Sequence, residues 1–375
     1  MRQFARFYLL RFPGFGRTVT GRERVVAGWC EMDGMGAEMA TASQAGEAEQ
    51  AVRPLVAVTR EIPEAGMALL REAADLRVWP DEMPPSAAEL AELIHGCVGA
   101  LTLLTDHIDG AVLDKEPQLK VVSNFAVGFD NVDVPAATER GVAICNTAGV
   151  LTEATADFAF ALLMAAARRI VEGVDYVRDG NWRTWGPTLL RGQELTGATI
   201  GIVGFGRIGK EVAKRASGFA MRILAHDSYQ DEDAARALGA TFTELDDLLR
   251  ESDYVTLHVA LTDETTHLIG AREFGLMKPT AILINAARGP VVDTDALVDA
   301  LRNGEIFAAA LDVTDPEPLP ADHPLVSLPN AIVVPHIASA TVATRDAMAT
   351  LAARNLLAVL RGERPEQIVN PDVLG

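Results

Sequence analysis

The feature that most constrains this 375-residue chain is an apolar run at residues 198–203 that passes directly into a glycine-rich loop. The loop reads Gly204-Phe-Gly206-Arg-Ile-Gly209, and a helical pattern follows it. In this context the first glycine makes a tight turn, the second lets a pyrophosphate approach the backbone, and the third lets the helix pack closely on the strand. This order of strand, loop and helix predicts a parallel, doubly wound sheet with an anion site at the helix N-terminus.

Short apolar runs alternate with helical periods along most of the chain. We expect strands at 55–59, 98–104, 120–123, 198–203, 221–225, 254–258, 281–284, 306–311 and 331–334, and helices at 63–74, 152–178 and 341–360. Strands that alternate with helices form parallel sheets covered on both faces. The sequence therefore predicts the α/β class, with two Rossmann- or flavodoxin-like doubly wound domains and a cleft between them. The last helix is expected to be amphipathic and to pack back on the first domain.

Composition narrows the classes of partner. The chain has 52 acidic and 33 basic residues, and its net charge is −19. So acidic a surface repels phosphate backbones and anionic lipid, so we expect neither nucleic acid nor a membrane as partner. No apolar run is long enough for a transmembrane helix. Three cysteines at long spacings exclude a disulfide framework and a zinc ribbon, so we predict no metal site and a reducing, cytoplasmic location.

The first 53 residues differ from the rest. Six arginines and one acidic residue, Glu23, occur in the first 24 positions, and a small, polar, Gly/Ala-rich stretch follows. An arginine-rich transit peptide has this composition. The interpretation we favour is a disordered tail, or an extension translated from a start codon upstream of the true one.

A carboxylate in the expected place indicates the cofactor. Asp227 follows the next strand, 18 residues beyond Gly209. There it hydrogen-bonds ribose hydroxyls and repels a 2′-phosphate, which favours NAD over NADP. Arg222, the nearest arginine, lies at the other end of that strand.

Three more side chains define a reaction class. Arg288 and His336 each follow an apolar strand, so both lie at carboxyl ends, where open α/β sheets bind ligands. An arginine there clamps a carboxylate. A carboxylate partner, for which Glu317 is the candidate, would raise the pKa of the histidine and make it a proton donor near neutral pH. Hydride, carboxylate clamp and proton donor together indicate reduction of a 2-keto acid, or oxidation of the 2-hydroxy acid in reverse.

These motifs, in this order over residues 55–374, resemble the D-isomer-specific 2-hydroxyacid dehydrogenases. The resemblance rests on the glycine loop, N-x-x-R-G-x-x-V-D at 285–293, D-V-x-x-x-E-P at 312–318 and P-H-I at 335–337. It implies a catalytic set of Arg288, Glu317 and His336, and it puts Asp312 beside the nicotinamide carboxamide. Further cofactor contacts that we predict are Thr155, Gly204, Gly206, Arg207, Ile208, Gly209, Asp227, His258, Ala286, Arg288 and His336.

Within the family, the chain is similar to glyoxylate/hydroxypyruvate reductases. The similarity is carried by V-T-R-E-I-P at 58–63, by N-F-A-V-G-F-D-N-V-D at 124–133 and by N-W-R-T-W-G-P at 181–187. It implies that Val127 and Gly128 present backbone N–H groups to the substrate carboxylate. It also implies a homodimer in which Trp185 reaches the neighbouring subunit's active site, although packing alone would also account for this tryptophan.

The combined prediction is an NAD-dependent enzyme that reduces glyoxylate or hydroxypyruvate to glycolate or D-glycerate. We assign residues 1–53 to the extension, 54–150 with 338–375 to the substrate domain, and 151–337 to the NAD-binding domain. Two alternatives stay open. A short-type 3-phosphoglycerate dehydrogenase would need added cations, of which Arg60 is one candidate. An NAD-sensing corepressor would keep the same residues but act by binding proteins.

Overall fold

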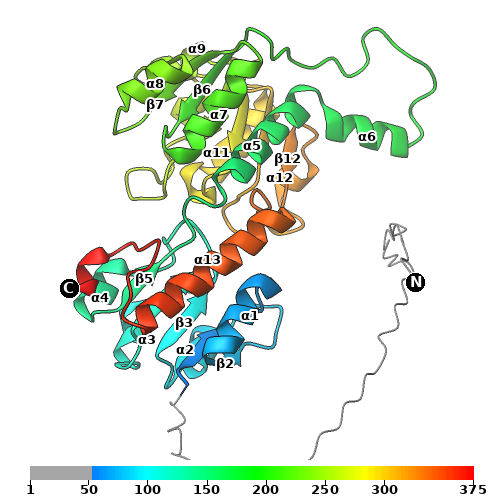
Figure 1. Ribbon diagram of the computed structural model, residues 1–375. Helices are drawn as coiled ribbons and strands as arrows, with labels where there is room; N and C mark the ends of the chain where they lie inside the picture. The colour runs from blue at the N-terminus through cyan, green and yellow to red at the C-terminus, as the bar shows by residue number, and fades with distance from the viewer. Residues whose placement is uncertain (1–52) are drawn as a thin grey trace, which may run out of the picture. The chain divides into compact units, whose positions relative to one another are not determined.

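The computed structural model describes residues 53–375 and contains two parallel β-sheets flanked by helices (Figure 1). This confirms the predicted α/β class. The interpretations of the N-terminal extension concern residues 1–52 almost entirely and lie outside the described part of the chain. Among residues 53–375, no helix combines the length and the apolarity that a membrane crossing requires.

The first sheet has five parallel strands in the order β2-β1-β3-β4-β5. Its strands are β1 (Leu55–Val58), β2 (Asp75–Val78), β3 (Gly99–Thr102), β4 (Val121–Asn124) and β5 (Ala143–Cys145). Its helices are α1 (Glu64–Ala73), α2 (Ala87–Ile94), α3 (Gly110–Asp114), α4 (Val134–Glu139) and the returning α13 (Val342–Leu360). Both faces are covered: Val56 and Val58 pack toward α1 and α13, and Ala57 between them packs on the opposite face.

The second sheet has seven parallel strands in the order β12-β11-β10-β9-β6-β7-β8. Its strands are β6 (Thr199–Val203), β7 (Arg222–His226), β8 (Ala240–Phe242), β9 (Tyr254–Leu257), β10 (Ile282–Asn285), β11 (Ala308–Leu311) and β12 (Ala331–Val333). Its helices are α5 (Thr152–Ala167), α7 (Arg207–Gly218), α8 (Glu232–Leu238), α9 (Leu245–Glu251), α10 (Ala271–Phe274), α11 (Thr294–Asn303) and α12 (Pro324–Ser327). Successive strand residues alternate between two cores: Ile282 and Ile284 pack in one, and Leu283 in the other.

The order of the seven strands positions a site. From β6 the chain winds outward through β7 and β8, then returns to β9 on the other side of β6 and continues to β12. The carboxyl ends of β6 and β9 therefore flank the point at which the winding reverses. In open α/β sheets that point forms the ligand crevice.

The single helix that we predicted over 152–178 is two helices. The first helix ends with α5, because Arg169 adopts a left-handed backbone with φ of 50°. The carbonyl of Ala167 accepts a hydrogen bond from the N–H of Gln193, at 2.8 Å, in place of a further helical turn. The second helix, α6 (Ile170–Arg178), has no buried residue in the described chain and projects from the body of the fold (Figure 1). A periodicity of apolar residues could not locate this break.

The last helix packs on the first sheet, as predicted. Thr341 caps α13, accepting the N–H of Thr344 at 3.1 Å, and the helix then lies against α1, β3 and β4. It is less amphipathic than predicted, because it is covered by the sheet on one side and by α1 on another, and its buried residues are spread around it. The oxygen of its Ala352 carbonyl accepts the Ser123 hydroxyl at 2.8 Å, which ties the helix to β4.

Candidate active site

A cavity of about 490 Å³ lies between the carboxyl ends of the two sheets. Loops after β4, β9, β10 and β12, with the first turns of α5, α7 and α13, supply its walls. The predicted site residues that line it are Val127, Gly128, Thr155, Arg207, Ile208, His258, Ala286, Arg288, Asp312 and His336. Segments more than 200 residues apart in the sequence therefore meet at one place.

The glycine loop has the geometry that its sequence predicts. Gly204 has a φ of 95°, and a side chain there would stand 2.6 Å from the His258 carbonyl carbon. A side chain at Gly209 would overlap the Gly204 carbonyl oxygen, whereas one at Gly206 would meet open space. The loop is thus closed on the sheet side and open at Gly206, where no side chain caps α7. Its first N–H groups are left to a ligand.

Asp227 lies against this loop. One carboxylate oxygen accepts the N–H of Phe205 at 2.6 Å, and the other accepts the N–H of Tyr229 at 3.0 Å. The carboxylate is therefore fixed between the glycine loop and the end of β7. It lies outside the cavity lining, as do the three glycines.

His258 follows β9 and lines the cavity from the side of the second sheet. Its Nε2 lies 2.8 Å from the Thr256 hydroxyl, and its Nδ1 has no partner within the described chain. Burial lowers the pKa of this imidazole to about 4, so the ring is neutral at physiological pH. A neutral imidazole with one free nitrogen is suited to a polar, uncharged group of a ligand.

Arg288 joins the two halves of the cavity. Its Nε donates to Asp130 Oδ1 at 3.0 Å, and its Nη1 donates to the Ala287 carbonyl at 2.8 Å. Its Nη2 lies against Gly128 so closely that a Cβ on that residue would overlap it. Two nitrogens are thus held by protein, while the Nη2 edge faces the Gly128 backbone.

The turn that contains Val127 and Gly128 offers backbone donors at the same place. The Asn146 side-chain amide donates to the Val127 carbonyl at 2.8 Å, and that of Asn124 donates to the Gly128 carbonyl at 3.0 Å. The N–H groups of Val127 and Gly128 have no hydrogen-bond acceptor among residues 53–375. Two N–H groups beside an arginine edge form a site for a carboxylate.

His336 is held on two sides. Its Nδ1 lies 2.7 Å from Glu317 Oε1, and the Asp312 carboxylate accepts the N–H groups of Ile337 and Ala338 at 2.7 and 2.9 Å. Burial raises the pKa of Glu317, but the hydrogen bond and charge of His336, the Thr314 N–H and Arg288 outweigh it, and the pKa stays below its usual range. Burial raises the pKa of Asp312 despite its two backbone donors. Glu317 is therefore an ionised acceptor that leaves Nε2 as the free ring nitrogen.

Two further predicted residues do not line the cavity. Glu317 is not in the cavity lining and touches it only through His336. Trp185 is 79% exposed and lies in the segment after α6, outside this cavity.

The sequence reasoning missed Asp130, which fixes Arg288, and Arg345, which enters from α13. Asp130 lies inside the 124–133 motif, two residues after Gly128, and this position could have indicated a contact with the substrate-binding arginine. Arg345 follows His336 by nine residues and had no local motif.

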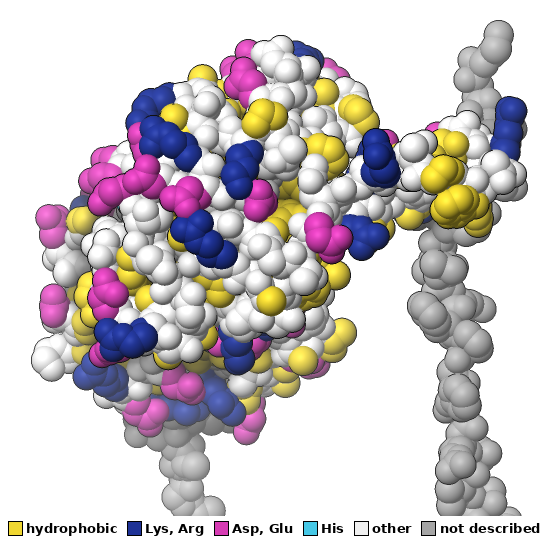
Figure 2. All heavy atoms as spheres, turned by 90° about the horizontal axis from the view of Figure 1, so that it is seen from above, with side chains coloured by type: hydrophobic (Ala, Val, Ile, Leu, Met, Phe, Trp, Pro, Cys, Tyr) yellow, Lys and Arg dark blue, Asp and Glu magenta, His cyan; other side chains and the backbone are white. Residues whose placement is uncertain are grey.

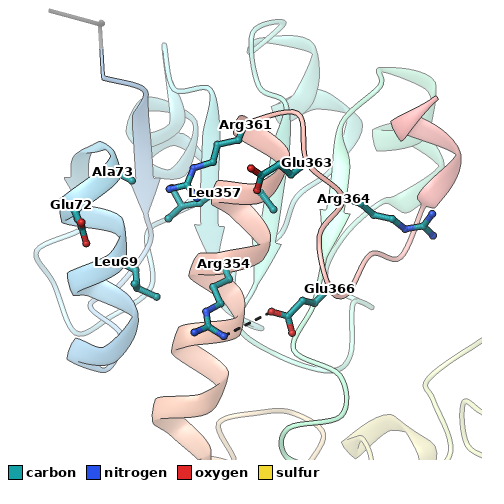
Figure 3. A pocket seen from close by; sticks show the side chains of 10 residues that line it. Leu69, Glu72, Ala73, Arg354, Leu357, Arg361, Glu363, Arg364 and Glu366 are labelled. Atoms are coloured by element: carbon teal, nitrogen blue, oxygen red, sulfur yellow. Dashed lines mark ion pairs between the residues drawn. The ribbon is translucent and has the colours of Figure 1, made fainter.

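A second hollow lies between α1 and the C-terminal end of α13 (Figure 3). Its charged residues are mixed in sign, and Arg354 lies 4.0 Å from Glu366. It contains no histidine or thiol.

A dinucleotide fits the residues present. The positive-φ Gly204, the open position at Gly206 and the anchored Asp227 provide the turn, the backbone approach and the carboxylate that such a group needs. His258, with its unpartnered Nδ1, and Thr155 line the cavity beside the same loop.

Comparison with known proteins agrees with this geometry. Residues 160–338 match the model for the NAD-binding domain of D-isomer specific 2-hydroxyacid dehydrogenases. A glyoxylate reductase of Korarchaeum cryptofilum is 51% identical over 324 residues, which are 86% of this chain and 98% of that protein. A glyoxylate reductase of Thermococcus gammatolerans is 49% identical over 327 residues, 86% of this chain and 98% of that protein.

Solved structures share the fold. A protein of Thermus thermophilus has a TM-score of 0.80 at 49% identity, over 84% of this chain and 99% of that one. The NADPH-dependent glyoxylate/hydroxypyruvate reductase of Sinorhizobium meliloti, solved with NADP and malonate, has a TM-score of 0.75 at 33% identity, over 84% of this chain and 97% of that one. Since relatives at about 50% identity match over nearly their whole length and the NAD-binding domain of this family matches residues 160–338, the chain belongs to the D-isomer specific 2-hydroxyacid dehydrogenase family.

Proposed function

We propose that this protein reduces a small 2-keto acid, glyoxylate or hydroxypyruvate, to the D-2-hydroxy acid, glycolate or D-glycerate, with NADH. The observation that carries the proposal is the convergence of the Arg288 edge, the free N–H groups of Val127 and Gly128, and His336 on one cavity beside the glycine loop. The names of the glyoxylate reductases at about half identity support it.

Each part has a chemical task in this proposal. Arg288 and the two N–H groups bind the substrate carboxylate, and Arg288 also polarises the neighbouring carbonyl. Glu317 accepts the Nδ1 hydrogen of His336, so Nε2 faces the carbonyl oxygen and delivers the proton that makes it a hydroxyl. When bound, the reduced nicotinamide supplies the hydride to the keto carbon. We assign the cofactor to residues 151–337 and the substrate carboxylate chiefly to residues 54–150 with 338–375.

The first experiment follows loss of NADH absorbance with glyoxylate, hydroxypyruvate, pyruvate and 3-phosphohydroxypyruvate, repeated with NADPH. We expect fast turnover of the first two with NADH. Turnover of the phosphorylated acid alone would support the phosphoglycerate dehydrogenase alternative. If none of the four acids is turned over while NADH still binds, the result would favour the protein-binding alternative.

The position of Arg60 argues against the phosphorylated substrate. Its guanidinium donates to the Thr105 hydroxyl and lies 4.0 Å from the fully buried carboxylate of Asp106. The arginine is thus engaged within the protein and is absent from the described cavity lining. A phosphate would have to compete with a buried carboxylate for it.

We propose NAD rather than NADP because of the charge at Asp227. Asp227→Asn keeps a hydrogen-bond acceptor for Phe205 while removing the negative charge, so it is a cleaner test than Asp227→Ala. We expect it to lower the ratio of kcat/KM with NADH to kcat/KM with NADPH by roughly tenfold, because the repulsion between the Asp227 charge and the 2′-phosphate is lost. An unchanged ratio would mean that the adenosine ribose is read elsewhere.

We also propose a homodimer built on α6 and the segment after it. The apolar side chains Ile170, Val171, Val174 and Val177 are 41–53% exposed on a helix without buried residues, and Trp182 and Trp185 follow at 63% and 79%. Figure 2 shows hydrophobic side chains on this projecting arm. An apolar surface of this kind marks an interface, and Trp185 would reach the partner's cavity from it. Sedimentation should give a dimer, and Val174→Asp with Val177→Asp should give a monomer.

The cytoplasmic location stays a prediction. The two cysteines of the described chain are free and buried, and burial raises the pKa of the Cys145 thiol to about 12. Such a thiol is unreactive and suits a reducing compartment.

A further inference from the structure

The cavity is lined by three arginines, Arg207, Arg288 and Arg345, and the chemistry proposed above does not use the last of them. Arg345 lies in the first turn of α13, where its N–H donates to the Thr341 carbonyl at 2.9 Å. Its side chain lines the same cavity as Arg288 and His336 but arrives from a different element. Arg207 is assigned to the cofactor and Arg288 to the substrate carboxylate, so Arg345 is left for a further group.

Arg345 is uncommitted, whereas Arg288 is held by Asp130. The Arg345 guanidinium makes no hydrogen bond or ion pair within residues 53–375, and its one specific contact is the Phe125 ring, 5.9 Å from the guanidinium carbon to the ring centre. It is half-buried, and burial lowers its pKa although the charge of Asp312 acts in the other direction. A half-buried guanidinium that has no acceptor in residues 53–375 is free to donate to a ligand in the cavity.

The surroundings limit what that acceptor is. Phe125, Met348 and Leu104 make this wall of the cavity apolar, and the buried Asp312 carboxylate is near enough to act on Arg345. A phosphate dianion would meet one cation, an apolar wall and a negative charge. A neutral hydroxyl needs only a single donor, and the carboxylate of the substrate already has Arg288 and two N–H groups.

We propose that Arg345 binds the C3 hydroxyl of the keto acid, so that the site is selective for hydroxypyruvate over acids with no polar group at C3. The inference rests on the proposed function, because it takes the carboxylate to lie at Arg288 and the carbonyl at His336. A short keto acid anchored in this way has only its third carbon left to reach Arg345. Glyoxylate has no third carbon and does not use this contact.

The test compares Arg345→Met and Arg345→Lys with wild type on hydroxypyruvate, glyoxylate, pyruvate and 3-phosphohydroxypyruvate. A hydrogen bond from a charged donor corresponds to a loss of about 10- to 100-fold in kcat/KM for hydroxypyruvate in Arg345→Met. Glyoxylate should change by less than about threefold, since it makes no such contact. Lysine should recover part of the hydroxypyruvate activity. The wild type should prefer hydroxypyruvate to pyruvate, and the Met variant should lose that preference.

Arg354→Met is the matched control. Arg354 lies on the same helix, faces Glu366 at the distant hollow and does not line the cavity (Figure 3). It should leave the substrate ratios unchanged, and NADH binding and thermal unfolding should confirm that all variants are folded.

Four results would overturn the inference. Equal losses on glyoxylate and hydroxypyruvate would give Arg345 a role in carboxylate binding or packing, while leaving the proposed function standing. A loss confined to the phosphorylated acid would make Arg345 a phosphate ligand. An unaffected hydroxypyruvate activity would remove it from recognition. A wild type that reduces neither small acid would refute the proposed function and the inference together.

Discussion

His336→Ala should lower kcat by about 10²- to 10⁴-fold while NADH binds nearly as before, because a positioned proton donor contributes a factor of this size. His336 lines the cavity, and its Nδ1 is occupied by Glu317, so the Nε2 that the variant loses is the ring nitrogen free to serve the substrate. Stopped-flow turnover with glyoxylate and a fluorescence titration with NADH would measure the two quantities separately. Near-normal turnover would remove His336 from the proton-transfer role.

A second variant, Glu317→Gln, tests the hydrogen-bond partner of His336. Glutamine keeps a similar size but replaces the charged acceptor at His336 Nδ1 with a neutral amide oxygen. We therefore expect a smaller loss of kcat than in His336→Ala, because the ring stays in place on a weaker hydrogen bond. An unchanged kcat would mean that Glu317 only packs against the ring.

The second large effect is expected at Gly128. A methyl group there would overlap Nη2 of Arg288, and it would also stand 2.8 Å from Asp130 Oδ1. Both are ends of side chains, and the Gly128 backbone has no positive φ, so Gly128→Ala should fold and displace the guanidinium. Loss of one preorganised donor for the substrate predicts a fall of about 10²- to 10³-fold in kcat/KM. Steady-state kinetics beside a thermal unfolding curve would test it.

Two controls isolate the cause. Gly110→Ala adds a methyl group whose nearest neighbours lie at an ordinary 3.7 Å, so it should leave activity unchanged. If Gly128→Ala acts by moving Arg288, it should cost little more in an Arg288→Ala background. Additive losses in the double variant would show that Gly128 acts on the substrate independently of Arg288.

Local sequence patterns predicted the motifs well because each is a short stretch at the end of a strand. The glycine loop, Asp227, Arg288 and His336 all follow apolar strands, so their position at the carboxyl ends could be derived from strand order alone. The edge strands β2, β5 and β8 escaped prediction. Asp75–Val78 and Ala240–Phe242 contain no fully buried residue, and β5, although buried, has only three residues.

Contacts across the cavity could not be derived in this way. The Asp130–Arg288 ion pair joins residues 158 positions apart, and its existence depends on how the two sheets face one another. Arg345 likewise belongs to the cavity only because α13 returns to the first sheet. The break at Arg169 is set by a backbone angle and by the Gln193 hydrogen bond to α5. Neither changes the spacing of apolar residues in the sequence, so neither could be predicted from it.

The backbone of His336 has a φ of 53°, a left-handed conformation that a histidine adopts at a cost of about 1 kcal/mol. The Asp312 carboxylate offsets that cost by binding the next two N–H groups, so the residue is kept in place although its own backbone preference opposes it. A glycine at this position would relieve the strain and remove the imidazole. If His336 is the proton donor, a gain in stability at this turn removes it, so selection for thermostability alone favours a loss of activity here.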